Sequence, residues 1–203
     1  MIDAVVFDLG NVLVRWDPAA AFAGVLPDVE VQRFLADVDF PALNQRQDAG
    51  RPWTEARAEV ADRHPEHVAT LDLYVERFAH ALPGEVPGSA AVVDDLRAAG
   101  VRVLGLTNWS AQTFHHAVPA APAIGRLEAV VVSGQEGVAK PDPRIFRLLA
   151  TRHGLVPGRT VFTDDSPANV AAAEAEGFQG VLFTDAAALR AELVARGVLG
   201  AGS

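Results

Sequence analysis

The chain has 203 residues, half of them hydrophobic and 21% charged, as expected for one folded domain or a domain with a small insert. Its net charge of −9 argues against a nucleic acid partner, because proteins that bind nucleic acids usually present a basic face. The absence of cysteine excludes disulfides, thiolate metal sites and cysteine nucleophiles.

The first predicted strand is the apolar run Ala4–Phe7, which ends on the carboxylate of Asp8. The segment before it carries Asp3 and no basic region, so we expect no signal peptide. No apolar run approaches the roughly 20 residues that a membrane helix needs. We therefore expect a protein without a membrane span, located in the cytoplasm.

The next part of the chain, from about Arg15 to Leu82, shows no convincing strand and has a helical pattern. It is too long for a loop, so we interpret it as an all-helical insert, which we call the cap. The predicted cap helices, broken at Pro27, Gly50 and Pro65, are Ala19–Val25, Val29–Asp37, Trp53–Arg63 and Glu66–Ala81.

Strands and helices alternate in the second half of the chain. The predicted strands are short Val-rich runs, at Val101–Leu106, Ala129–Val132, Thr160–Thr163 and Gly180–Phe183. The predicted helices are Ala90–Ala99, Pro143–His153 and Asn169–Glu176. This order is typical of an α/β fold with an open, doubly wound parallel sheet. We predict a core domain of residues 1–14 and 86–203, and a cap domain of residues 15–85.

Polar side chains follow four of the predicted strands, at the edge where such sheets bind ligands. They are Asp8 after the first strand, Thr107 and Asn108 after the second, Lys140 after the third, and Asp164 with Asp165 after the fourth. Each has a local alternative. Asp8 precedes Gly10-Asn11, a hairpin signal, while the others suit helix caps, turns or a solvated lysine.

Taken together, these groups suit phosphoryl transfer. A carboxylate can attack phosphorus and form an aspartyl-phosphate, and two further carboxylates can hold a divalent cation, typically Mg²⁺. A hydroxyl, an amide and an ammonium group can bind the phosphate oxygens as charge develops on them. Independent turn residues would have no reason to occur in this order at consecutive strand ends.

The same four segments resemble the motifs of the haloacid dehalogenase-like (HAD) hydrolase superfamily. They are "FDLGNVL", "LTN", "KPDPRIF" and "FTDDSPANV", and they span Asp8 to Asn169, with the helical insert where that family places its small cap. The resemblance implies a Rossmann-like HAD core and a hydrolase. The form "DLGNV" in particular resembles bacterial α-glucose-1-phosphate phosphatases.

The resemblance also implies the role of each site residue. Asp8 is expected to be the nucleophile and a ligand of Mg²⁺. The other metal ligands are expected to be the Gly10 carbonyl and Asp165, with Asp164 ligating or one shell further out. Thr107, Asn108 and Lys140 are expected to bind phosphate, and Asn169 to support the fourth-motif loop. Lys140 is also expected to lower the pKa of Asp8 and keep it ionised.

One position departs from the family pattern. Most phosphatases of this superfamily carry a second aspartate two places after the first, which protonates the leaving oxygen and later activates water. Here that position is Gly10, which has no side chain. General acid–base catalysis is typically worth about 10²–10⁴ in rate. Asp17 is our candidate substitute, and its alternative role is to cap the helix that begins at Pro18.

The cap is expected to select the substrate. The segment "LNQRQDAGRPW" offers Asn44, Arg46 and Arg51 on a polar loop next to Trp53, and this loop can dip toward the core or remain solvated. Three further residues are candidates for the entrance of the site: Arg15, Trp16 and Trp109.

Three functions remain open at this point. The first is a Mg²⁺-dependent phosphatase for a small phosphorylated metabolite of the sugar-phosphate type, acting as a monomer or homodimer. The second is metal-independent dehalogenation of 2-haloacids by the same aspartate, which would not need Asp164 and Asp165. The third is a weakly active or non-catalytic binding protein, which only the missing acid at Gly10 supports.

Overall fold

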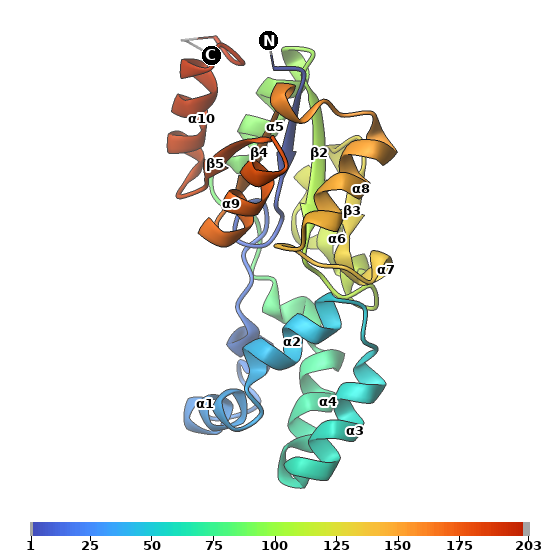
Figure 1. The fold of residues 1–203 in the computed structure, drawn as a ribbon. Helices are drawn as coiled ribbons and strands as arrows, with labels where there is room; N and C mark the ends of the chain where they lie inside the picture. Colours follow the sequence, from blue (N-terminus) through green and yellow to red (C-terminus); the bar gives the residue numbers. More distant parts are fainter. Residues whose placement is uncertain (1, 201–203) are drawn as a thin grey trace.

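The computed structural model describes residues 2–200 and contains five parallel strands in the order β3-β2-β1-β4-β5. The strands are β1 (Ala4–Phe7), β2 (Arg102–Thr107), β3 (Val130–Val132), β4 (Thr160–Asp164) and β5 (Gln179–Leu182). Helices cover both faces of this sheet, and a separate group of helices lies beyond one end of it (Figure 1). The predicted α/β fold with a helical cap is confirmed.

The central strand β1 shows why the strands are continuous apolar runs. Val5 and Phe7 belong to one hydrophobic cluster, while Ala4 and Val6 belong to the other. The first cluster includes residues of α5 (Ser89–Ala98) and α10 (Ala186–Ala195), and the second includes residues of α8 (Pro143–His153) and α9 (Pro167–Ala175). Because successive side chains point to opposite faces, both faces must be apolar.

The predicted core elements lie within one or two residues of the observed ones, whereas α10 and the short helices of the core were not predicted. The two ends of α8 show the local reason. Asp142 accepts a hydrogen bond from the backbone N–H of Arg144, and Gly154 has a φ of 61° at the C-terminal end. A side-chain cap and a left-handed glycine are strong boundary signals. The remaining short helices of the core are α6 (Ala117–Ala120), α7 (Ser133–Glu136), η4 (Phe114–His116), η5 (Pro122–Arg126) and η6 (Pro157–Arg159).

The cap contains four α-helices and three 3₁₀ helices. They are α1 (Asp28–Asp37), α2 (Phe40–Asp48), α3 (Trp53–Arg63), α4 (Val68–Glu76), η1 (Pro18–Phe22), η2 (Pro65–His67) and η3 (Phe78–Ala81). Aromatic rings form their core around Tyr74, which contacts Phe22, Phe40, Trp53 and Phe78. Burial of large aromatic side chains is the main source of stability for such a small unit.

Two of the predicted cap helices were wrong in detail. Ala19–Val25 is a shorter 3₁₀ helix, η1, and Gly24 beyond it has a left-handed φ of 74°. Glu66–Ala81 is divided among η2, α4 and η3, and at the second break the Arg77 side chain donates to the Ala21 carbonyl. Such tertiary contacts are invisible to a local pattern.

The predicted polar loop around Asn44 is part of helix α2. Phe40, Leu43 and Gln47 form its buried face, at spacings of three and four residues. Pro41 in the first turn suits a helix start. The segment was taken for a loop because its sequence is mostly polar and ends at Gly50.

The chain crosses between core and cap twice, and the two crossings run side by side. Arg15 donates its backbone N–H to Gly84 O at 2.9 Å, and Val86 donates to Leu13 O at 3.0 Å. These hydrogen bonds lie next to the predicted borders at residues 15 and 85, although the domain boundaries themselves stay a prediction. Within residues 2–200, every helix is too short or too polar to cross a lipid bilayer.

We expect Gly134→Ala to lower the free energy of unfolding by about 1–3 kcal/mol, because the added methyl group overpacks a tight contact. A Cβ at Gly134 would lie 2.5 Å from the backbone nitrogen of Ala111 and 2.6 Å from the carbonyl oxygen of Trp109. Gly158→Ala is the matched control, since its Cβ would meet nothing within 4 Å. Equal unfolding midpoints in urea for the two variants would contradict this expectation.

Candidate functional site

The candidate site lies at the carboxyl ends of β1, β2 and β4, which are neighbours in the sheet. Phe7 pairs with Gly105 on β2 and with Thr163 on β4, so Asp8 follows directly beside both strands. The backbone N–H of Asp8 donates to Thr163 O at 2.8 Å. The parallel register therefore brings the first, second and fourth motifs together.

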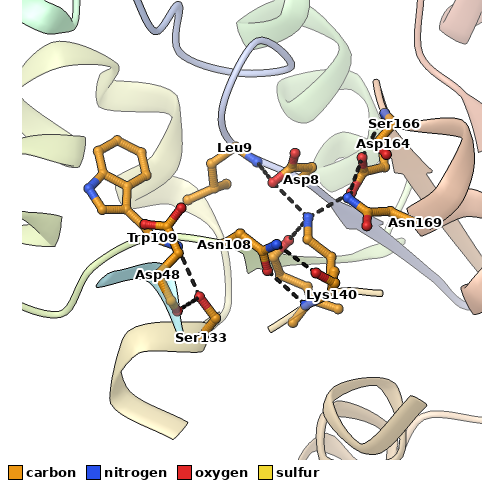
Figure 2. A network of polar contacts seen from close by, with 11 residues as sticks. Asp8, Leu9, Asp48, Asn108, Trp109, Ser133, Lys140, Asp164, Ser166 and Asn169 are labelled. Carbon is orange, nitrogen blue, oxygen red and sulfur yellow. Dashed lines mark hydrogen bonds and ion pairs between the residues drawn. The ribbon is translucent and has the colours of Figure 1, made fainter. Parts of the chain in front are cut away.

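Lys140 lies at the centre of this site. Its Nζ is 2.9 Å from Asp8 Oδ1, 2.6 Å from Asp164 Oδ2 and 2.8 Å from the carbonyl oxygen of Leu106 (Figure 2). The residue is only 2% exposed, so water cannot satisfy its ammonium group, and the three acceptors in the protein match its three N–H donors. Burial lowers the pKa of Lys140, but the two carboxylates raise it by more, and the side chain stays charged.

The pKa of Asp8 differs from the expectation. Burial raises it well above its usual value, and Asp164 raises it further. Lys140 lowers the pKa as predicted, but by less than burial raises it. The sequence predicted the ion pair with Lys140 but not the burial of Asp8, so the prediction that the pKa of Asp8 is lowered overall was wrong. A buried carboxylate of this kind is poorly solvated, which makes it a better nucleophile once ionised.

Asp164 is held from three sides. It accepts from Lys140, from the backbone N–H of Ser166 at 2.9 Å and from Asn169 Nδ2 at 3.0 and 3.1 Å (Figure 2). Asn169 thus supports the fourth-motif loop, and the local turn considered as an alternative is also present. The neighbouring Asp165 keeps part of its surface in solvent, and the loss of the remaining solvent contact, together with the charge of Asp164, raises its pKa.

The donor set fits a hard divalent cation. Carboxylate oxygens of Asp8, Asp164 and Asp165 all lie within 4.8 Å of one another. Mg²⁺ prefers oxygen ligands and is usually bound by one or two carboxylates with water and phosphate oxygens. Gly10, the fourth predicted ligand, lines the adjoining pocket, and the metal-binding role of its carbonyl stays a prediction.

The second motif positions Lys140. Asn108 Nδ2 donates to Lys140 O, and the backbone N–H of Lys140 donates to Asn108 Oδ1, both at 2.8 Å. The amide of Asn108 is thereby used within the protein, and its direct contact with phosphate stays a prediction. Thr107, the last residue of β2, is 1% exposed beside the nucleophile's strand.

A pocket lies between cap and core, with a cavity volume of about 70 Å³. Three of its lining side chains are aromatic and come from the linker, the cap and the core. The lining residues are Gly10, Trp16, Asn44, Asp48, Phe78, Asn108, Trp109 and Thr113. Of the predicted entrance and cap residues, the structure brings Trp16, Asn44 and Trp109 to this pocket.

Other predicted cap residues lie elsewhere. Arg46 and Arg51 both pair with Glu59 on α3, at 3.0 and 2.5 Å, so neither arginine points into the pocket as expected. Arg15 donates to Pro83 O in the linker. Asp17 is exposed and accepts from Ala19 N, which is the capping alternative considered for it.

Asp48 was not predicted as a site residue. It ends helix α2, lines the pocket and accepts hydrogen bonds from Asn44 Nδ2 at 2.8 Å and from the backbone N–H of Ser110. Burial raises its pKa to about 7, and the charge of Asp8 acts in the same direction. The sequence offered one signal, an acidic residue between Asn44 and Gly50 in the cap segment already suspected of facing the core.

Comparisons with known proteins agree with the geometry. The family model of the haloacid dehalogenase-like hydrolases matches residues 2–177. The sesquiterpene phosphatase astK of Aspergillus oryzae is 25% identical over 197 residues, which cover 94% of each chain. Mouse acyl-CoA dehydrogenase family member 10 is 29% identical over 88% of this chain, which spans only 17% of that protein.

Solved structures show the same fold. A HAD family enzyme from Bacteroides thetaiotaomicron, in complex with magnesium and inorganic phosphate, has a TM-score of 0.68 and 20% identity. The similarity covers 91% of this chain and 96% of the other. At this level of identity the likeness concerns the arrangement of core and cap.

Proposed function

Because the chain belongs to the haloacid dehalogenase-like hydrolases, we propose that it is a Mg²⁺-dependent phosphatase that hydrolyses small phosphorylated metabolites through an aspartyl-phosphate on Asp8. The single observation that carries the proposal is the group of three carboxylates, Asp8, Asp164 and Asp165, of which the first two contact a buried ammonium group. An aspartate that displaces halide from carbon has no use for this cation site.

In the proposed reaction the Asp8 carboxylate attacks phosphorus, and the bond from phosphorus to the leaving oxygen breaks. Lys140 holds Asp8 in place through the contact at 2.9 Å and reduces its repulsion from the phosphate. Bound Mg²⁺ would supply positive charge for the phosphate oxygens, held by Asp8, Asp165 and the Gly10 carbonyl, with Asp164 ligating or one shell further out. Asn108 holds the backbone of Lys140, and Thr107 would offer a hydroxyl to the phosphate.

For the substrate we propose a compact monophosphate of the sugar-phosphate type. The aromatic rings of Trp16, Phe78 and Trp109 would contact its apolar face, and Asn44 would contact a hydroxyl. The same rings also suit a monophosphate with a fully apolar body, and the similarity to a sesquiterpene phosphatase supports including that class in the test. The cytoplasmic location and the monomer or homodimer state stay predictions.

We expect phosphate release from such monophosphates to stop in EDTA and to return with excess Mg²⁺. The experiment measures initial rates with sugar phosphates, isoprenyl monophosphates and 2-haloacids, each with Mg²⁺ and with EDTA. Turnover of a 2-haloacid that survives EDTA would instead favour the dehalogenase. Absence of turnover on every substrate would favour a binding protein.

A further inference from the structure

Hydrolysis of an alkyl phosphate ester needs a proton transfer in each of its two steps. The leaving oxygen must receive a proton when its bond to phosphorus breaks, and the attacking water must lose one in the second step. Gly10, two residues after the nucleophile, has no side chain to do this. Some other group that faces the leaving oxygen must therefore carry the proton.

Asp48 lies where such a group is needed. It is the only ionisable side chain among the described residues that line the pocket, which it shares with Gly10 and Asn108. Gly10 lies two residues after the nucleophile, and Asn108 is bonded to the backbone of Lys140, so the pocket that Asp48 lines adjoins the reacting centre. Asp17, the residue first considered for this role, is exposed and caps the N-terminus of η1. The structure therefore does not support Asp17 as the proton donor.

The carboxyl group of Asp48 is held from both sides of the pocket. From the cap, Asn44 donates to its Oδ2, and from the core, the backbone N–H of Ser110 donates to it. The backbone carbonyl of Asp48 accepts a hydrogen bond from Ser133 Oγ, and the same hydroxyl oxygen accepts one from the backbone N–H of Trp109 (Figure 2). A catalytic group must be oriented in this way before it can transfer a proton efficiently.

The cap around Asp48 is docked on the core. Trp53 at the start of α3 donates its backbone N–H to Gln112 Oε1 at 2.7 Å. The backbone at Gly50 packs against Gly134 and Gly137, because a Cβ there would lie 3.3 Å from Gly137 Cα. These contacts hold the segment that carries Asp48 against the core, so an opening of the cap would carry Asp48 away from the site.

We propose that Asp48 is the general acid and general base of this enzyme, supplied by the cap in place of the side chain missing at Gly10. This inference rests on the proposed phosphatase function. When the phosphorus–oxygen bond of the substrate breaks, the leaving oxygen takes the proton of the Asp48 carboxyl group, and the alcohol departs. Water then gives a proton to the Asp48 carboxylate and attacks phosphorus. The Asp8–phosphate bond breaks, and inorganic phosphate leaves with Asp8 and Asp48 restored.

The environment of Asp48 suits both steps. Burial and the charge of Asp8 raise its pKa, whereas the N–H of Ser110 and the charge of Lys140 lower it, with a net value of about 7. A group with a pKa near the working pH can both give and accept a proton. The role of Asp48 as general acid and base is inferred from its place in the pocket, and its pKa agrees with that role.

The test compares two monoesters of similar shape with Asp48→Asn. p-Nitrophenyl phosphate has a leaving group that needs no proton, whereas 2-phenylethyl phosphate has one that does. We expect the variant to lose about 10²–10⁴ in kcat/KM on the alkyl ester. On p-nitrophenyl phosphate it should release a first equivalent of nitrophenolate at a rate within about tenfold of wild type. Its steady-state turnover should then be slower, because water is no longer activated.

Asp62→Asn is the matched control, an exposed aspartate on α3 given the same change. Equal losses on both esters in the first turnover would show that Asp48 only maintains structure and would overturn the proposal. Unchanged kinetics in Asp48→Asn, or the split appearing in Asp17→Asn instead, would overturn it as well. A wild type that hydrolyses neither these two esters nor any sugar phosphate or isoprenyl monophosphate would refute the proposed function itself, and the inference with it.

Discussion

Replacing Asp8 by Asn is expected to lower kcat by about 10⁴-fold or more on every phosphate monoester, since loss of a nucleophile removes the covalent route. Asn has nearly the same shape, and Lys140 keeps its contact of 2.6 Å with Asp164 and its bond to the carbonyl of Leu106. We therefore expect the variant to fold. The measurement is steady-state phosphate release with Mg²⁺ present.

The control for this prediction is Asp62→Asn, which makes the same change on the exposed surface of α3. Circular dichroism and thermal unfolding of both variants separate a lost nucleophile from a lost fold. Residual activity of Asp8→Asn within tenfold of wild type would show that another group attacks phosphorus.

Replacing Lys140 by Met is expected to lower the free energy of unfolding by about 3–5 kcal/mol, in addition to abolishing activity. The change leaves Asp8 and Asp164 buried beside each other without the ammonium group that now lies 2.9 and 2.6 Å from them. Lys140 is the only lysine among the 17 basic residues, and it is 2% exposed. Urea unfolding at neutral pH measures the loss.

Two further variants sharpen this test. Adding Asp164→Asn to Lys140→Met removes one of the two uncompensated carboxylates, so part of the stability should return. Arg57→Met removes the cation of an exposed ion pair with Asp72, and it should cost no more than about 1 kcal/mol. The electrostatic explanation is wrong if Lys140→Met and Arg57→Met lose the same stability.

Local patterns predicted most of the core. Strands such as Ala4–Phe7 are apolar because both faces are buried, and Asp142 and Gly154 mark the two ends of α8. The parallel sheet then brings the ends of its strands to one edge, so Asp8, Lys140 and Asp164 were predicted to meet. The helix α10 was missed, because its Ala-rich sequence hides the buried spacing of Ala186, Leu189 and Leu193.

The cap residues were harder to predict, because their positions depend on docking between distant segments. Asp48 faces the site through contacts with Ser110 and Ser133, which lie 62 and 85 residues further along the chain. Arg46 was expected near the substrate, but it pairs with Glu59 on a neighbouring helix. Local sequence gives the polarity of such residues, and only tertiary packing decides which of them line the pocket.

The most direct test of the proposed function is the detection of a phosphate group on Asp8. Enzyme mixed with p-nitrophenyl phosphate and Mg²⁺ is quenched in acid within the first turnover, digested and analysed by mass spectrometry. We predict phosphate on the peptide that contains Asp8, with more of it in Asp48→Asn, where the second step is slowed. Phosphate on another residue, or a first turnover that leaves no phosphopeptide in either enzyme, would contradict a mechanism through Asp8.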